Sequence, residues 1–145
     1  MTQSARKEDR STAPLSALRA GTAYAGDPSM IPAARDFADA FLDDAAARGV
    51  QVARRQRDAV RLVVSELVTN VVRHAPGPCR LGLRLRDGTL EVSVTDTSPS
   101  TPAPLPRDPS RIGQHGLEIV HALCVAVEEE RTPAGKTVRV CIAVT

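Results

Sequence analysis

Apolar side chains in residues 58–75 recur at the spacing of an α-helix, which turns by about 100° per residue. The apolar positions are three or four residues apart and would bury one broad face of such a helix. This face consists of Val60, Val63, Val64, Leu67, Val68, Val71 and Val72. We therefore predict a long amphipathic helix at the centre of the fold, ended by the Ala-Pro-Gly-Pro run at 75–78.

A polar stripe accompanies the apolar face of this predicted helix. Glu66, Asn70 and Arg73 stand at i, i+4 and i+7, so they lie in line beside the buried face. A carboxylate, an amide oxygen and a cation in this arrangement could hold a metal-bound phosphate. An ordinary amphipathic helix with surface polar residues gives the same pattern, because E-x-x-x-N is a weak motif. Ser65 and Thr69 are expected to face water.

An edge strand and another helix are predicted before the central helix. Residues 15–25 loosely fit one strand at the edge of a sheet, and Gly-Asp-Pro-Ser at 26–29 indicates a turn. Asp27 or Ser29 could cap a helix that stops at Gly49. Residues 1–14 are polar, lack periodicity and are predicted to be disordered, which leaves 15–145 as a single domain. The apolar side of this helix would carry Ile31, Ala34, Phe37, Ala38, Phe41 and Leu42.

Residues 79–95 alternate between apolar and polar side chains, as strands with one covered face do. Asp87-Gly88 divides them and predicts a hairpin. The proline-rich stretch 96–112 has no apolar period, and a connection of this length is usually functional or disordered. A short helix at 117–124 and a closing hairpin of 125–131 with 136–144 complete the chain.

Composition narrows the possible functions. The 145 residues suit one domain, and the formal net charge of +2 does not ask for a polyanionic partner. Basic residues are scattered and aromatic residues make up only 2%, so direct nucleic-acid binding is not expected. No apolar run approaches a membrane span and no signal-like segment starts the chain, so we expect a cytoplasmic protein. Three isolated cysteines argue against a disulfide framework or a zinc site.

Three predicted features could surround one nucleotide pocket. Asn70 could supply the oxygen that Mg²⁺ needs beside phosphate oxygens, and Glu66 could act as a general base on a hydroxyl. Asp96, at a strand end, could accept a hydrogen bond from an exocyclic amine. Gly113 and Gly116 precede a helix, where backbone N–H groups can approach phosphate.

Each feature also has an ordinary structural interpretation. A lone Asp at a strand end is more often a turn former, and Gly-x-x-Gly before a helix is often only a tight turn. His74 and His115 are as compatible with packing or solvation as with binding. Neither G-x-x-x-x-G-K-[ST] nor G-x-G-x-x-G occurs, so a P-loop or dinucleotide fold is not indicated.

The order of the motifs resembles that of the GHKL ATPase superfamily, the histidine kinase-like ATPase domain. ELVTN and RHA come first, followed by a strand ending in Asp96, then GQHGLEIV and a late GKT. The resemblance runs from about 24 to 144 and is strongest to actinobacterial anti-sigma-factor serine/threonine kinase-like regulators. It implies an α/β (α+β) two-layer sandwich, with a mixed, mostly antiparallel sheet covered by helices on one face.

The resemblance also implies roles for individual residues of the central helix. Glu66 would be the catalytic general base and Asn70 the magnesium ligand. Arg73 and His74 match positions that face the phosphates or the ribose. ATP and Mg²⁺ are thus the implied cofactors.

Further implied roles fall in the second half of the chain. Asp96 would bind the adenine amine, and Thr137 matches a threonine that supports adenine through water. The lid motif would supply four nucleotide-binding residues, with the glycines as hinges: Gly113, His115, Gly116 and Leu117.

The adenine box departs from the superfamily pattern Asp-x-Gly-x-Gly. Asp96 is followed by Thr-Ser-Pro-Ser at 97–100, and proline and β-branched residues restrict approach of the backbone to a base. The leading hypothesis is an ATP-dependent serine/threonine kinase that binds a sigma factor and phosphorylates an anti-anti-sigma partner, with homodimerisation a further expectation. The alternative is a catalytically weak or inactive nucleotide-binding or protein-interaction module of this fold. A third interpretation, an unrelated α/β domain with coincidental motifs, would be favoured if Asn70 and Asp96 lay on opposite sides of the molecule.

Overall fold

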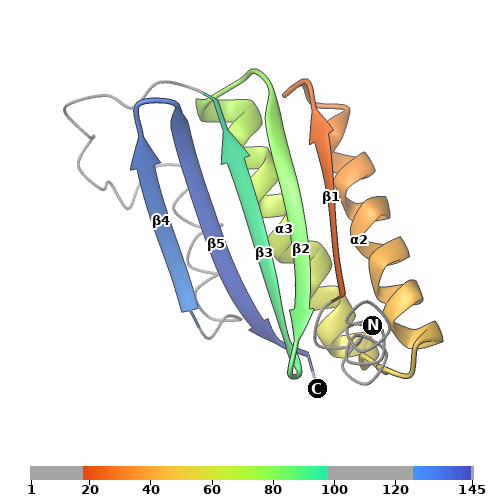
Figure 1. Cartoon of the computed structure of the whole chain (residues 1–145). Coiled ribbons are helices and arrows are strands. Elements are labelled where there is room, and N and C mark those ends of the chain that lie inside the picture. Colours follow the sequence, from red (N-terminus) through yellow and green to blue (C-terminus); the bar gives the residue numbers. More distant parts are fainter. Residues whose placement is uncertain (1–17, 98–125, 145) are drawn as a thin grey trace, which may run out of the picture.

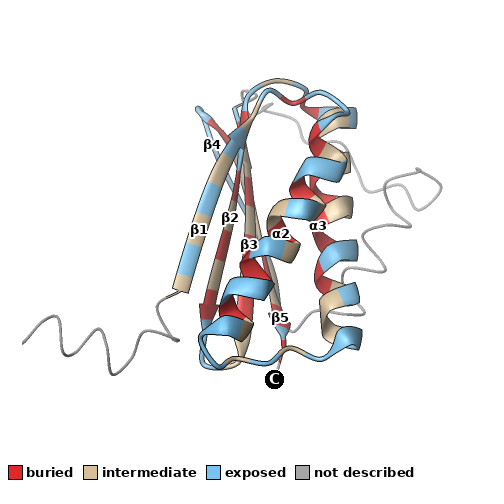
Figure 2. Cartoon of the chain, turned by 90° about the vertical axis from the view of Figure 1, so that its right-hand side faces the viewer, coloured by how far each residue is buried: buried red, intermediate tan, exposed pale blue. Residues whose placement is uncertain are grey.

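A computed structural model describes residues 18–97 and 126–144, which form a sheet covered by helices on one face (Figures 1 and 2). The five strands follow the order β1-β2-β3-β5-β4, and every pairing among them is antiparallel. The predicted two-layer α+β sandwich is therefore confirmed. The predicted disordered tail 1–14 and the short helix 117–124 lie outside the described residues. The described elements are β1 Leu18–Tyr24, α2 Met30–Ala47, α3 Arg54–His74, β2 Cys79–Arg86, β3 Thr89–Asp96, β4 Ala126–Thr132 and β5 Gly135–Ala143.

The hairpin between β2 and β3 forms at Asp87-Gly88, as its sequence predicts. Asp87 has a φ of 51° and Gly88 a φ of 75°. Positive φ at both central residues is what a type I′ turn requires, and this turn matches the twist of the flanking strands. The turn fixes the register that runs from Arg86 opposite Thr89 to Cys79 opposite Asp96.

The core lies between the sheet and the two helices. Burial alternates along β2 and β3, so one side chain in two points at the helices and the others line the open face. The central helix contributes the apolar face that its periodicity predicts, with Val72 only partly buried. The largest fully buried side chains are Leu42, Leu81, Leu83, Leu85, Leu90, Ile142, Val60, Val63, Val64, Val68 and Val92.

Polar contacts join α2 to α3 along the outer side of the helical layer. Arg57 donates to the carboxylate of Asp43 at 2.8 Å and to the carbonyl oxygen of Asp39 at 3.1 Å. Arg35 donates to the hydroxyl of Ser65 at 3.3 Å. Ser65 is half-buried against α2, so the expectation that it faces water is wrong. The reason is that α2 packs beside α3 and brings a long arginine over that position.

The start of α2 depends on Asp27 more than on the helix-capping serine. Ser29 makes no side-chain capping bond, whereas its backbone N–H donates to Asp27 Oδ1 at 2.9 Å and its hydroxyl donates to the same oxygen. These hydrogen bonds hold the pKa of the Asp27 carboxyl below its ordinary value. None of the helices in the described ranges is long and apolar enough to cross a membrane.

Candidate functional site

A pocket of about 100 Å³ opens between the C-terminal half of α3 and the sheet. One side, which we call the helix wall, comes from α3 and the residue that ends it: Leu67, Asn70, Val71 and Ala75. The other side, the sheet wall, comes from β3, β4 and β5: Val94, Asp96, Val127, Glu129, Lys136 and Val138. The volume is below the roughly 300–1,000 Å³ of typical ligand sites, so it suits one ring system, and the remainder of a nucleotide would have to extend beyond it.

Asp96 is the buried carboxylate of the sheet wall. It is 3% exposed and is the only buried charged side chain in the described part of the chain. Burying a carboxylate is costly unless it is compensated, which makes its position inside a pocket chemically informative. Cys79 lies opposite Asp96 on β2, and burial, followed by the Asp96 charge, raises the pKa of the Cys79 thiol. The alternation of burial along β3 places Asp96 in the same helix-facing row as Val92 and Val94.

Asn70 brings the amide of the polar stripe to the same pocket as Asp96. The third interpretation of the sequence, with these two residues on opposite sides, does not fit this arrangement. Glu66 stands one turn earlier on the same stripe and is half-buried, but it does not line the pocket. The structure therefore brings together the amide and the strand-end carboxylate and leaves the glutamate adjacent to them.

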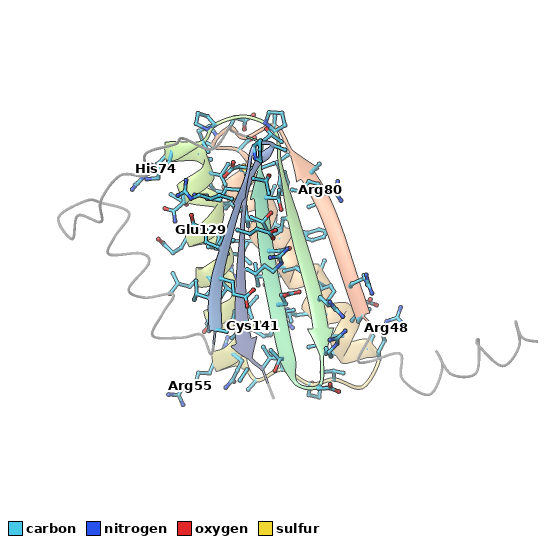
Figure 3. The ribbon with its side chains drawn as sticks, turned by 60° about the vertical axis from the view of Figure 1, so that its left-hand side comes forward. Arg48, Arg55, His74, Arg80, Glu129 and Cys141 are labelled. Atoms are coloured by element: carbon cyan, nitrogen blue, oxygen red, sulfur yellow. The ribbon has the colours of Figure 1, made fainter. Side chains whose placement is uncertain are left out.

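Arg73 and His74 occupy the exposed last turn of α3. Figure 3 shows His74 at the end of the helix, projecting outward, while Glu129 lies nearer the space between helix and sheet. Neither Arg73 nor His74 lines the pocket. The guanidinium of Arg73 in the last turn interacts favourably with the helix dipole whatever else it does.

Thr137 does not share a face with Asp96. The β3–β5 register pairs Thr137 with Thr95, and the two hydroxyl oxygens are 2.9 Å apart. Successive side chains of a strand point to opposite faces, so Thr137 lies on the open face of the sheet, away from the pocket. The assignment of Thr137 to the base does not match this placement.

Lys136 and Glu129 are charged residues of the pocket that the sequence motifs do not single out, and Gly135 stands next to Lys136 at the start of β5. The register places Lys136 directly opposite Asp96. Gly135 has a φ of 151°, and a Cβ atom built on it would lie 2.0 Å from the carbonyl oxygen of Asp96. Only glycine permits this close approach of β5 to the end of β3. A signal exists in the sequence, since a glycine before a strand often marks a close backbone contact.

The four lid-motif residues lie outside the described ranges: Gly113, His115, Gly116 and Leu117. The described side chains show whether this part of the chain could hold a magnesium ion. Within residues 18–97 and 126–144 no three acidic, histidine or cysteine side chains gather into a metal site. Asn70, with Glu66 one turn away, offers a sparse oxygen set that suits Mg²⁺ held mainly by phosphates and water.

Comparisons with known proteins agree with this fold. The family model of the histidine kinase-like ATPase domain matches residues 25–142. In fold, the chain is similar to the RsbU and RsbW domains of Rv1364c from Mycobacterium tuberculosis, with a TM-score of 0.66 and 16% identity over 88% of this chain. It is also similar to the blue-light activated histidine kinase EL346 of Erythrobacter litoralis, with a TM-score of 0.54 and 25% identity over 66% of this chain.

The chain spans 32% of the length of each of these two solved chains. A search of curated proteins gave no match. The family match covers most of the chain, including both pocket walls, and the solved structures share its fold. The chain belongs to the histidine kinase-like ATPase domain family.

Proposed function

We propose that this protein binds ATP with Mg²⁺ in the pocket between α3 and the sheet, and that it is a regulatory serine/threonine kinase of the anti-sigma-factor type. The observation that carries the proposal is the meeting of Asn70 and the buried Asp96 in one pocket, in a chain of an ATPase family. Arg73 and His74, just beyond the pocket on α3, are proposed to approach the phosphates or ribose of the bound nucleotide.

The space between the two walls, beside Asp96, suits an adenine ring. A carboxylate can only accept hydrogen bonds when ionised, and the amino group of adenine is a donor. Leu67 and Val71 on one side and Val94 and Val138 on the other supply apolar surface for the two faces of the ring. This combination of an apolar slot and one polar anchor is typical of small-molecule sites.

The side of the pocket beside Asn70 suits the phosphates. Asn70 would hold Mg²⁺ by its amide oxygen, and the ion would neutralise phosphate charge. Glu66 would accept the proton of a substrate serine while the serine oxygen bonds to the γ-phosphorus and the bond to ADP breaks. The lid residues Gly113, His115, Gly116 and Leu117 belong to this proposal as the cover of the phosphates.

The proposed partners are a sigma factor and an anti-anti-sigma protein that accepts the phosphate, in the cytoplasm, with homodimerisation as a further element. The support is the resemblance of the motifs together with the fold likeness to a protein that contains an RsbW domain.

A second candidate, a catalytically weak nucleotide-binding module, has specific support. Glu66 does not line the pocket, and Ser98 and Ser100 stand where the adenine box of the superfamily has its two glycines. A chain of this kind would bind ATP and its partner without transferring phosphate.

Calorimetric titration with ATP, with and without Mg²⁺, tests nucleotide binding. We expect the wild type to bind, Asp96→Asn to weaken binding at least about tenfold through the lost charged acceptor, and Asn70→Ala to remove the Mg²⁺ dependence. Ser93→Ala, on the open face of β3, is the matched control and should bind as the wild type does. A folded wild-type chain that binds no ATP would overturn the proposal. Equal affinity of Asp96→Asn and the wild type would remove Asp96 from the site.

A further inference from the structure

Lys136 places a cation beside Asp96 in the pocket, and none of the nucleotide-binding roles implied by the motifs uses it. The antiparallel register places Lys136 opposite Asp96, and directly opposed residues point to the same face of a sheet. Both side chains line the pocket. A carboxylate and an ammonium group therefore approach one ligand from neighbouring strands.

Among the described residues, Lys136 is the cation that lines this pocket, whereas the neighbouring Arg131 does not line it and pairs with the lining residue Glu129. Arg131 lies opposite Lys136 on β4, but its Nε atom is 2.7 Å from the carboxylate of Glu129. Arg131 is exposed and does not line the pocket, whereas Lys136 is half-buried and does. Partial burial strengthens whatever charge interaction Lys136 makes with a ligand.

The two side chains offer complementary hydrogen bonding. An ionised Asp96 only accepts, and Lys136 only donates, through three N–H groups on a flexible stem. At position 6, adenine carries an amino donor and guanine a carbonyl acceptor. A carboxylate alone would satisfy the amino group of adenine and repel the carbonyl oxygen of guanine.

With Lys136 present, both purines find partners. For adenine, Asp96 accepts from the amino group and Lys136 can donate to a ring nitrogen. For guanine, Lys136 donates to the carbonyl oxygen and Asp96 accepts from the ring N–H and the amino group. Discrimination against an analogue is strong only where it leaves a buried polar group unpaired, and here neither purine does so.

We propose that Lys136 makes the base site tolerant of both purines, so that guanine nucleotides bind within about tenfold of the affinity of adenine nucleotides. The inference rests on the proposed function, since it assumes that the pocket holds the base. It assigns to Lys136 a specificity role in the place of Thr137, whose side chain lies on the other face of β5.

Titration calorimetry with ADP and with GDP, in the presence of Mg²⁺, tests the inference on the full chain. We expect the dissociation constants of the wild type to lie within about tenfold of each other. Lys136→Met removes the charge at similar length and should weaken GDP at least about tenfold more than ADP. Lys136→Gln, which restores a donor, should recover part of the GDP affinity.

Arg139→Met is the matched control, because it removes a cation of the same strand that lies opposite Ser93 on the open face and pairs with Glu130, away from the pocket. It should change the two affinities by the same small factor. Thermal melting of each variant shows whether it is folded. A wild type that binds ADP but not GDP overturns the inference and leaves the proposed function intact, as does an equal loss of both nucleotides in Lys136→Met. A folded wild type that binds neither nucleotide overturns both.

Discussion

The two walls of the pocket are specified by different kinds of information. On the helix wall, Leu67, Asn70 and Val71 belong to one unbroken helix, and their common direction follows from its 3.6-residue period. On the sheet wall, Asp96 and Lys136 meet because strands distant in sequence pair in one register. A helix position that is misassigned by one residue turns a side chain by about 100°, whereas a strand position misassigned by one turns it to the opposite face.

This difference explains why Asn70 reaches the pocket from its place on the helical stripe, whereas Thr137 of the GKT motif does not. In GKT, the alternate residues are Lys136 on the pocket side and Thr137 on the open side. Perturbing the two walls separately should therefore give different kinds of defects, catalytic on one and conformational or specificity-related on the other.

The largest effect should come from Glu66, which lies on α3 one turn before the helix-wall residue Asn70. Glu66→Ala should slow phosphate transfer by about 10²–10⁴-fold, the usual contribution of a general base, while leaving ATP affinity unchanged. Transfer of labelled phosphate from ATP to an anti-anti-sigma protein measures the rate, and calorimetry measures the affinity. Glu91→Ala removes a carboxylate from the open face and should leave both unchanged. Equal loss of rate and affinity in Glu66→Ala would contradict a role confined to proton transfer.

The next largest effect should come from the turn that closes the sheet wall. Gly135→Ala would place a methyl group 2.0 Å from the carbonyl oxygen of Asp96, in a backbone conformation unfavourable to alanine. We expect a loss of about 2–4 kcal/mol in the free energy of unfolding, measured by urea denaturation.

Gly49→Ala separates the collision at Gly135 from backbone strain. Gly49 also has a positive φ, 99°, but nothing lies within 4 Å of the position that its Cβ atom would take. The variant should lose only about 1 kcal/mol. Similar losses in the two variants would show that the contact with Asp96 is unimportant to stability.

A smaller effect tests which face of β5 serves the nucleotide. Thr137→Val removes one partner of the Thr95 hydroxyl and should cost about 0.5–1.5 kcal/mol of unfolding free energy. The affinity for ATP should not change, because the side chain points away from the pocket. Thr95→Val, the other half of the pair, should behave alike in both measurements. A selective loss of ATP affinity in Thr137→Val would restore the role that the motif implied.

The smallest effect concerns the influence of the Asp96 charge on Cys79, its partner on β2. Burial and the Asp96 charge both raise the pKa of the Cys79 thiol, so its thiolate forms only at higher pH than that of a free cysteine. Asp96→Asn should lower the pKa of Cys79 and speed its alkylation at a fixed pH, while burial keeps the pKa above the ordinary value.

Cys141 is the internal control for that experiment. Its pKa is raised by burial and by Glu91 and Glu128, and it lies on the open face of β5. Mass spectrometry of alkylated peptides follows the two cysteines separately. A matching increase at Cys141 would indicate general loosening of the fold and not the loss of the Asp96 charge.

Most of the fold could be predicted from local patterns. The valine and leucine spacing locates α3, and Asp87-Gly88 locates the hairpin, because both features depend on neighbouring residues only. The edge position of β1 and the closing hairpin of β4 and β5 also follow from short-range signals. The water-facing prediction for Ser65 is wrong because its environment is set by Arg35, thirty positions away on another helix.

The site could be predicted only in part. Glu66 and Asn70 share a helical stripe, and Asp96 ends an alternating strand, so each carries a local signal. No local signal says that β5, and not β4, pairs with β3, and that choice decides that Lys136 joins the pocket. The glycine at 135 is a local signal of a close backbone contact, but its partner, the end of β3, appears only once the two strand ends are seen together.

The position of β5 between β3 and β4 affects the order in which the protein can fold during its synthesis. β3 ends at Asp96, and its second partner begins only at Gly135, so that pairing must close a long loop of chain. During synthesis, α3 and the β2–β3 hairpin can assemble while the pocket still lacks one side. A nascent chain on the ribosome therefore has no complete ligand site until β5 has emerged, and a nucleotide could stabilise only chains that have passed that point.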